Sequence, residues 1–331
     1  HQTLRPTITP LGTGSRPFMR ICSLVPGATE VVAALGLADQ LVGLSHECDF
    51  PPHLPDIPVM VRARIESQAL SSAQIDAQVG TMLSSGESLY ELDERRLLTA
   101  KPELLITQDL CDVCAITPSQ LTAVLTKLDP PPRLVTLNPR RLDDILQDIA
   151  LLGIALERQE AGAQLAARLR GRVDAVRKMV SATSTRPRVA CLEWLSPLYT
   201  AGHWVPDMVE AAGGIDTLTQ AGTASHRIDW DTLTASAPDV IVLMPCGFTI
   251  ARTRTELTTI TDHPRWKALP AVQRGQVYLV DALSYFSRPG PRLIDGVEQL
   301  AAIFYPAAVN HRLPPTIEQL TPHNSPAPMT R

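Results

Sequence analysis

Two patterns of apolar residues alternate along this chain. Short apolar runs of strand length are followed by segments in which apolar residues recur every three or four positions, as on one face of a helix. The predicted strands are 20–25, 40–45, 58–62, 102–107, 133–137, 187–192, 239–243 and 276–280. The predicted helices include 28–37, 71–84, 92–100, 142–156, 230–235 and 291–303. Strands that alternate with helices in this way indicate α/β structure with parallel-rich sheets.

The longest helical pattern, at 156–180, lies in the middle of the chain. Its apolar positions form one stripe, its basic residues occupy the other faces, and no proline occurs before Pro187. The stripe consists of Leu165, Leu169, Val173, Val176 and Val180. A helix of about 25 residues is ~38 Å long, as long as a small domain. We therefore predict a backbone helix at 156–181 that joins two lobes; the alternative is an ordinary long helix on one α/β domain.

Two segments on either side of this helix resemble each other. Residues 98–107 (LTAKPELLIT) and 233–243 (LTASAPDVIVL) each combine a helix end, a proline followed by an acid, and an apolar strand. This internal similarity predicts a pseudo-duplicated body with an N-terminal lobe at 19–155 and a C-terminal lobe at 186–306. Segments 1–18 and 307–331 are rich in proline and polar residues and are predicted to be disordered tails. Ligands of such sheets bind at the carboxyl ends of the strands, so we expect a ligand cleft between the lobes.

Composition excludes several classes of function. The chain has 331 residues, 44% of them hydrophobic, and a formal net charge of −4. No basic block indicates a nucleic-acid surface, and no apolar run approaches the ~20 residues of a membrane span. We see no signal peptide, and the six cysteines do not form a dense disulfide framework. These two observations favour a cytoplasmic location.

The opening of the first lobe resembles a known family. Residues 23–30 (SLVPGATE) are similar to the SLxPSxTE opening of helical-backbone ABC-transporter substrate-binding proteins, which bind cobalamin, haem and ferric siderophores. The resemblance extends over about 19–306 and includes the Gly213-Gly214 turn and the segment RGQVY at 274–278. It is greatest for the cobalamin-binding branch, because aromatic residues at 49–51 and 285–288 fall where that branch contacts the corrin ring.

The resemblance also implies a periplasmic or other extracytoplasmic location and an ABC permease as partner. Family members usually present an exposed glutamate on each lobe to the permease. In the predicted helix 92–100, Arg95 occupies the position where the first glutamate is expected. The docking pattern is therefore incomplete.

Polar and aromatic residues gather on the loops that leave the carboxyl ends of the predicted strands, which is typical of a ligand site. These candidates are His46, Glu47, Phe50, Asp109, Glu193, Trp194, His203, Trp204, Phe248, Tyr285 and Arg288. Aromatic walls suit a flat ring system, and Arg288 could reach its acidic or amide rim. We predict a monomer that captures a corrinoid or related metal chelate, requires no cofactor and is not an enzyme, since no catalytic motif is present.

The cysteines leave two alternative functions open. Cys111-x-x-Cys114 precedes a predicted helix N-terminus, which lowers the pKa of a thiol. Cys48 or Cys246, together with His46, could complete a set of four ligands, giving a cytoplasmic metal- or iron-sulfur-binding protein. A thiol oxidoreductase that uses Cys111 and Cys114 is the second alternative. The cysteines are otherwise small buried or idle side chains, and a single CxxC pair does not distinguish these cases.

Overall fold

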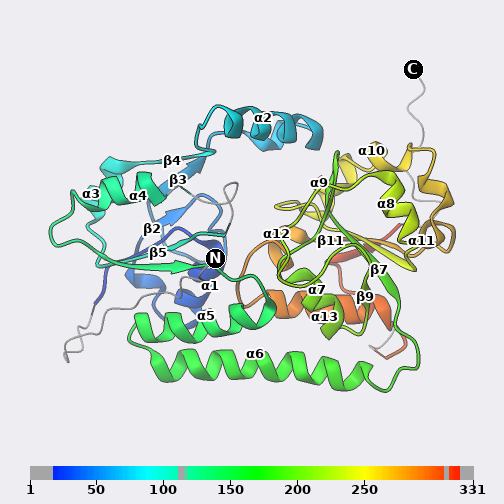
Figure 1. Cartoon of the computed structure of the whole chain (residues 1–331). Helices are drawn as coiled ribbons and strands as arrows, with labels where there is room; N and C mark the ends of the chain where they lie inside the picture. The colour runs from blue at the N-terminus through cyan, green and yellow to red at the C-terminus, as the bar shows by residue number, and fades with distance from the viewer. Residues whose placement is uncertain (1–17, 111–115, 117, 309–312, 321–331) are drawn as a thin grey trace.

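Two α/β lobes lie side by side, and a long helix runs along one side of both (Figure 1). The computed structural model describes residues 18–110, 116, 118–308 and 313–320. Each lobe has its own sheet with helices packed around it, which confirms the predicted fold class. The long helix, α6 (Gln159–Val180), contacts both lobes.

The N-terminal lobe is built on a six-stranded sheet of order β4-β3-β2-β1-β5-β6, parallel except for β4. Its strands are β1 (Ile21–Ser23), β2 (Leu41–Ser45), β3 (Val59–Ala63), β4 (Tyr90–Leu92), β5 (Leu104–Gln108) and β6 (Arg133–Leu137). Its helices are α1 (Pro26–Ala34), α2 (Ser72–Ser84), α3 (Glu94–Ala100), α4 (Pro118–Leu125) and α5 (Leu142–Ala155). The central strands are covered on both faces, which explains their continuous apolar sequence.

The C-terminal lobe has the strand order β12-β11-β10-β7-β8, and β9 pairs with β7. Its strands are β7 (Arg188–Leu195), β8 (Leu198–Thr200), β9 (Ile215–Asp216), β10 (Val240–Leu243), β11 (Val277–Val280) and β12 (Ile317–Gln319). Its helices are α7 (Val205–Ala211), α8 (Trp230–Ala235), α9 (Ile250–Thr255), α10 (Thr258–Thr261), α11 (Pro270–Gln273), α12 (Ala282–Tyr285) and α13 (Leu293–Phe304). Strand β12 lies inside the segment predicted to be a tail and pairs antiparallel with β11, so that prediction is wrong at 317–319.

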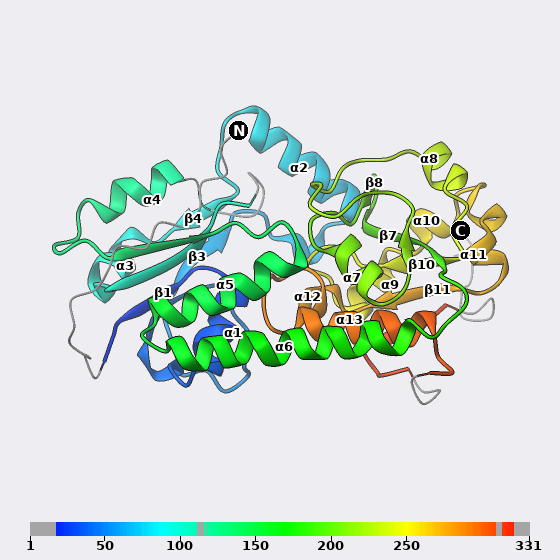
Figure 2. The ribbon, with the colours of Figure 1, turned by 60° about the horizontal axis from the view of Figure 1, so that its bottom comes forward.

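The predicted backbone helix begins later than expected. Helix α5 ends at Ala155 and the chain reverses before α6 begins at Gln159, so an unbroken helix from 156 is wrong. The reversal needs a left-handed residue, and Glu157 supplies it with φ of 57°. Glutamate rarely adopts this conformation. Residues 155–159 contain no glycine or proline, so no local signal marks the turn in the sequence. Figure 2 shows α5 and α6 running side by side as a helical hairpin.

Helix α6 is amphipathic, as its sequence predicts. All five residues of the predicted apolar stripe are buried. Arg172, in the C-terminal half of α6, binds Glu298 of α13 in the C-terminal lobe. Its Nε and Nη2 donate to the carboxylate of Glu298 at 2.9 and 2.7 Å. The helix therefore packs against α5 in one lobe and α13 in the other.

Two glycines allow α5 and α6 to approach closely. A Cβ on Gly162 would lie 2.6 Å from the Cα of Gly153, which is closer than real Cβ contacts allow. Gly171, which follows Gly162 by nine residues on α6, has no neighbour within 4 Å of its Cβ position. Packing therefore requires glycine at 162 but not at 171.

We expect Gly162→Ala to lower the free energy of unfolding by about 1–3 kcal/mol, because the methyl group must force the two helices apart. Gly171→Ala is the matched control and should raise it by about 0.5–1 kcal/mol, since alanine favours an exposed helix interior. Urea unfolding of both variants measures the difference. Equal effects of the two substitutions would contradict the close helix crossing.

Candidate functional site

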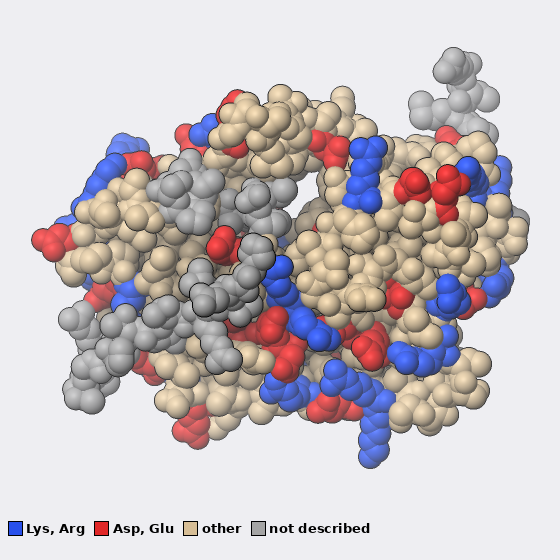
Figure 3. Space-filling view, in the orientation of Figure 1, with Lys and Arg blue, Asp and Glu red and all other residues tan. Residues whose placement is uncertain are grey.

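The carboxyl ends of the two sheets face each other. Residues after β1 and β2 contact residues that follow β11. On the other side of the molecule, Trp194 near the end of β7 contacts Ser72 at the start of α2. The lobes thus meet through the ends of their strands, and Figure 3 shows an opening beneath α2, bordered by the C-terminal lobe. This opening is the inter-lobe cleft.

The backbones of the two lobes make a direct contact after β1 and β11, which we call the floor of the cleft. A Cβ on Gly27, in the first turn of α1, would lie 2.0 Å from the carbonyl oxygen of Pro289. A Cβ on Gly290 would lie 2.7 Å from the Cα of Gly27. Only glycine fits at this contact in this chain, and Gly27 stands where the SLxPSxTE pattern has serine.

A buried ion pair lies beside this contact. Arg292 donates from Nε and Nη2 to Oε1 of Glu30 at 3.0 and 2.7 Å, and Glu30 is only 4% exposed. Burial raises the pKa of Glu30, although the hydrogen bond from Arg292 opposes this shift. The guanidinium of Arg292 also lies 4.1 Å from the ring centre of Phe50 and 5.9 Å from that of Tyr285. Arg292 therefore joins α1, an N-terminal-lobe loop and α12.

Arg288 makes a second ion pair between the lobes. Its side chain is 6% exposed and it donates to both carboxylate oxygens of Asp49, from the loop after β2. Arg288 was predicted to reach the rim of a ligand; in this structure its guanidinium is held by Asp49, and its contact with a ligand stays a prediction. Its buried Nε has no hydrogen-bond partner among the described residues.

Three predicted residues of the N-terminal lobe are exposed just after the carboxyl ends of its strands. His46 and Glu47 are exposed directly after β2, and Asp109 is exposed after β5. Glu47 and Tyr90 contribute to a small pocket of about 40 Å³ at these strand ends. The His46 ring lies 6.2 Å from the Tyr90 ring, and its Nδ1 is 3.2 Å from the carbonyl oxygen of Val61. Their role in binding a ligand stays a prediction.

On the C-terminal side, two predicted aromatic residues are buried. Trp204 is 5% exposed and its Nε1 donates to the carbonyl of Phe286 at 2.9 Å, so it belongs to the core rather than facing a ligand as predicted. Phe248 is 6% exposed and contacts the edge of Trp194, with 5.3 Å between the ring centres. A proline at the first turn of α7 and the buried helix that follows fix Trp204 in the core.

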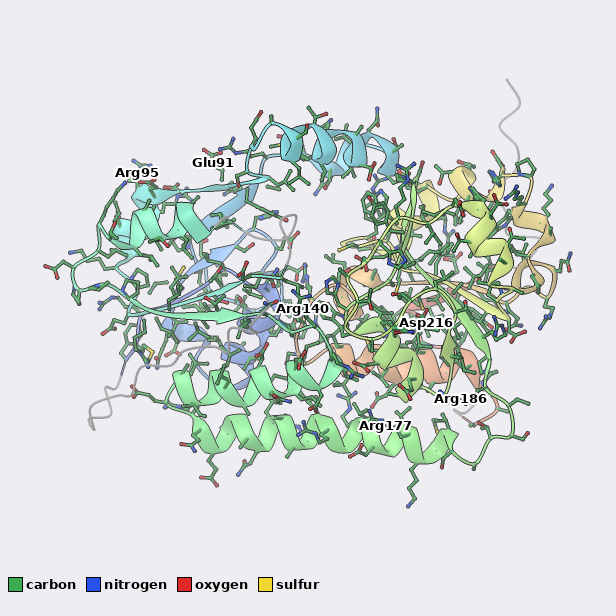
Figure 4. The ribbon with its side chains drawn as sticks, in the orientation of Figure 1. Glu91, Arg95, Arg140, Arg177, Arg186 and Asp216 are labelled. Atoms are coloured by element: carbon green, nitrogen blue, oxygen red, sulfur yellow. The ribbon has the colours of Figure 1, made fainter. Side chains whose placement is uncertain are left out.

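The polar candidates of this lobe, Glu193 and His203, are both partly buried. Glu193 accepts a hydrogen bond from the hydroxyl of Ser225 at 2.7 Å, and burial raises its pKa. His203 is half-buried, and burial and the nearby positive charge of Arg140 lower its pKa. Arg140 lies where the two lobes meet, two residues before α5 begins (Figure 4). This places His203 and Arg140 from different lobes close together.

The described cysteines do not support a metal or cluster site. The thiol of Cys48 is hydrogen-bonded by the hydroxyl of Thr29 at 3.1 Å, and burial raises the pKa of Cys48 to about 11. Cys246 is exposed on the loop after β10. Cys111 and Cys114 lie outside the described residues. Within the described part of the chain, no three His, Cys, Asp or Glu side chains are arranged to hold a metal ion.

Sequence reasoning missed the residues that join the lobes. Glu30 lies in the opening motif and Arg292 follows Arg288 by four positions, but nothing in the sequence pairs them. Two acidic residues of the C-terminal lobe, Asp207 and Glu256, bind the first turns of α5 and α2. Only Glu256 carries a local signal, since Arg252 precedes it by four positions on the same helical segment and pairs with it.

The chain belongs to the periplasmic binding protein family, whose sequence profile matches residues 21–283. The vitamin B12-binding protein of Vibrio cholerae is 26% identical over 292 residues, which cover 86% of this chain and 88% of that protein. Among solved structures, a periplasmic haem-binding protein from Pseudomonas aeruginosa has a TM-score of 0.68 at 21% identity, covering 92% of this chain and 98% of that one. The Vibrio cholerae B12-binding protein structure has a TM-score of 0.63 at 24% identity, with 88% and 98% covered.

The family assignment confirms the predicted substrate-binding class, whose members are carriers rather than enzymes. It contradicts the predicted cytoplasmic location, because the family consists of periplasmic proteins and a Bacillus subtilis relative, 21% identical over 87% of this chain, is named a substrate-binding lipoprotein. Cysteine count and the lack of a visible signal were poor guides to the compartment. No helix in the described residues is both long and apolar enough to cross a membrane.

We expect Arg292→Ala to lower the free energy of unfolding by about 3–5 kcal/mol, because Glu30 would then be buried without its counter-charge. Arg254→Ala is the control, since its pair with Glu318 has side chains that are 62% and 22% exposed. Such a pair contributes at most about 1 kcal/mol. Urea unfolding measures the free energy of unfolding of both variants. Equal decreases would show that the pair of Glu30 and Arg292 does not hold the lobes together.

Proposed function

We propose that this protein is an extracytoplasmic substrate-binding protein of an ABC uptake system that captures a corrinoid, or a related metal chelate, in the inter-lobe cleft. The observation that carries the proposal is the match to the Vibrio cholerae vitamin B12-binding protein along nearly the whole of both chains. The family assignment alone supports capture of a small ligand for import; the corrinoid is the more specific part of the proposal.

The cleft offers chemistry that suits a flat, largely apolar ring system with polar groups at its edge. Phe50 is 37% exposed, and Tyr285 from the opposite lobe is half-buried, so aromatic surface from both lobes borders the floor. Arg292 lies against both rings. The exposed His46, Glu47 and Asp109 supply hydrogen-bonding groups above this floor. A macrocycle with amide or carboxylate side chains would use both kinds of contact.

The permease partner would meet a surface of unequal charge. Asp93 and Asp229 are the N-caps of α3 and α8, so Arg95 and Asp231 are the second residues of these two helices, and both are exposed. Glu91 on β4 is exposed near Arg95 at the outer side of the N-terminal lobe (Figure 4). Arg95 is positively charged where the family has an acidic residue that contacts the permease. We propose that Glu91 makes this contact instead.

Titration of the protein with cobalamin should shift the corrin absorbance bands at micromolar ligand, and haem is the second titrant. Phe50→Ala should weaken cobalamin binding about tenfold, or ~1.4 kcal/mol, because it removes aromatic surface at the floor. Leu134→Ala is the control, since Leu134 is 41% exposed and is the second residue of β6, at the opposite end of the strand from its carboxyl end.

A response to haem alone would replace the corrinoid by a haem-type ligand within the same function. No response to either compound would contradict capture of a tetrapyrrole-like chelate.

A further inference from the structure

We propose that α2 is a lid on the inter-lobe cleft, held shut by a latch on the C-terminal lobe that releases when ligand enters or leaves. The latch consists of Leu70, Ser72, Trp194, Arg252 and Glu256. The inference concerns access to the cleft, and it rests on the proposed function for the identity of the ligand that enters. The contacts of the latch are present in the protein without ligand, so they can be tested without knowing the ligand.

The position of α2 is that of a cover. It belongs to the N-terminal lobe by sequence, yet in two views it extends toward the C-terminal lobe on the side opposite α5 and α6 (Figures 1 and 2). The opening of the cleft lies beneath it (Figure 3). The hairpin of α5 and α6 closes one side of the gap between the lobes, and α2 closes the other.

The centre of the latch is a carboxylate that caps a helix of the other lobe. The backbone N–H and the hydroxyl of Ser72 donate to Oε2 of Glu256 at 3.1 and 2.9 Å. Ser72 is the first residue of α2, where free N–H groups and the helix dipole favour a negative charge. Both residues are buried, at 0% and 4% exposure.

Two side chains flank this contact. Trp194 donates from Nε1 to the carbonyl of Ser72 at 3.1 Å. Arg252 donates to the carbonyl of Leu70 and to Oε1 of Glu256, the latter at 3.1 Å. The guanidinium of Arg252 also lies 4.7 Å from the ring centre of Phe248, which belongs to the same lobe. Residues before and within the first turn of α2 are thus held by one patch of the C-terminal lobe.

The remainder of α2 buries little surface and can separate from the C-terminal lobe. Of its 13 residues only Ser72 and Ile75 are buried, and Leu83 near the far end is 40% exposed. Elements with so little buried surface open at low free-energy cost. After release, Ser71 and Gln74 still cap the helix, and Glu256 keeps its pair with Arg252. Undocking therefore leaves no buried charge without a partner.

A comparison within the molecule shows what a permanent version of this contact looks like. Asp207 of the C-terminal lobe accepts a hydrogen bond from the N–H of Leu142, the first residue of α5, at 3.1 Å. Unlike α2, helix α5 buries half of its length, including Ile145, Ile149 and Leu152. The same type of cap is fixed at α5 and releasable at α2.

The test compares a Ser72→Ala/Trp194→Phe double variant with Ser84→Ala. The double variant removes two hydrogen bonds of the latch, whereas the hydroxyl of Ser84 donates to the carbonyl of Thr81 within α2 itself. Hydrogen exchange of the free proteins should show α2 amides exchanging about tenfold faster in the double variant, with α6 unchanged. Ser84→Ala should exchange like the wild type.

Unchanged exchange in α2, or equal acceleration in α2 and α6, would overturn the lid. Stopped-flow mixing with cobalamin then tests the link to function, and the double variant should bind several times faster than Ser84→Ala. Equal association rates would show that α2 does not control entry. If no variant binds cobalamin while α2 exchange responds as expected, the corrinoid proposal fails and the latch stands.

Discussion

Carboxylates that cross from one lobe to the first turn of a helix in the other join the two lobes, permanently at α5 and releasably at α2. Asp207 binds the start of α5 and Glu256 binds the start of α2, one on each side of the cleft. A helix N-terminus has free N–H donors and a partial positive charge, and both stabilise a carboxylate placed there. Each acid also pairs with an arginine, Arg141 or Arg252. The two lobes are therefore joined at opposite edges rather than by a single linker.

The floor of the cleft adds a third junction between these edges. Gly27 meets Pro289 and Gly290 backbone to backbone, and the pair of Glu30 and Arg292 lies beside them. Because α6 packs on both α5 and α13, a rotation of one lobe would have to break several of these contacts at once. Hinge motions need a few residues that absorb large dihedral changes, and here the connection is a packed helical hairpin. Access to the cleft is then more easily changed by moving α2 than by moving a lobe.

Local patterns in the sequence predicted much of the fold but few of the contacts that shape the site. The apolar runs became strands and the stripe on α6 became its buried face, because both depend on neighbouring residues. The turn before α6 was missed because Glu157 adopts a left-handed conformation that favours glycine. The pair of Asp49 and Arg288 joins residues 239 positions apart, a separation at which no local pattern operates. The aromatic residues were predicted by position alone, and burial then separated Trp204 and Phe248 from Phe50 and Tyr285.

The distance between the lobes is the most direct measure of this account. Spin labels introduced as unnatural amino acids at Leu134 and Ile215, which are 41% and 43% exposed and lie in different lobes, report it by pulsed dipolar spectroscopy. The account predicts one narrow distance in the free protein and a change of less than about 2 Å with saturating cobalamin, as expected for pre-organised binding. A second population in the free protein, or a larger shift on binding, would contradict lobes held at a fixed separation.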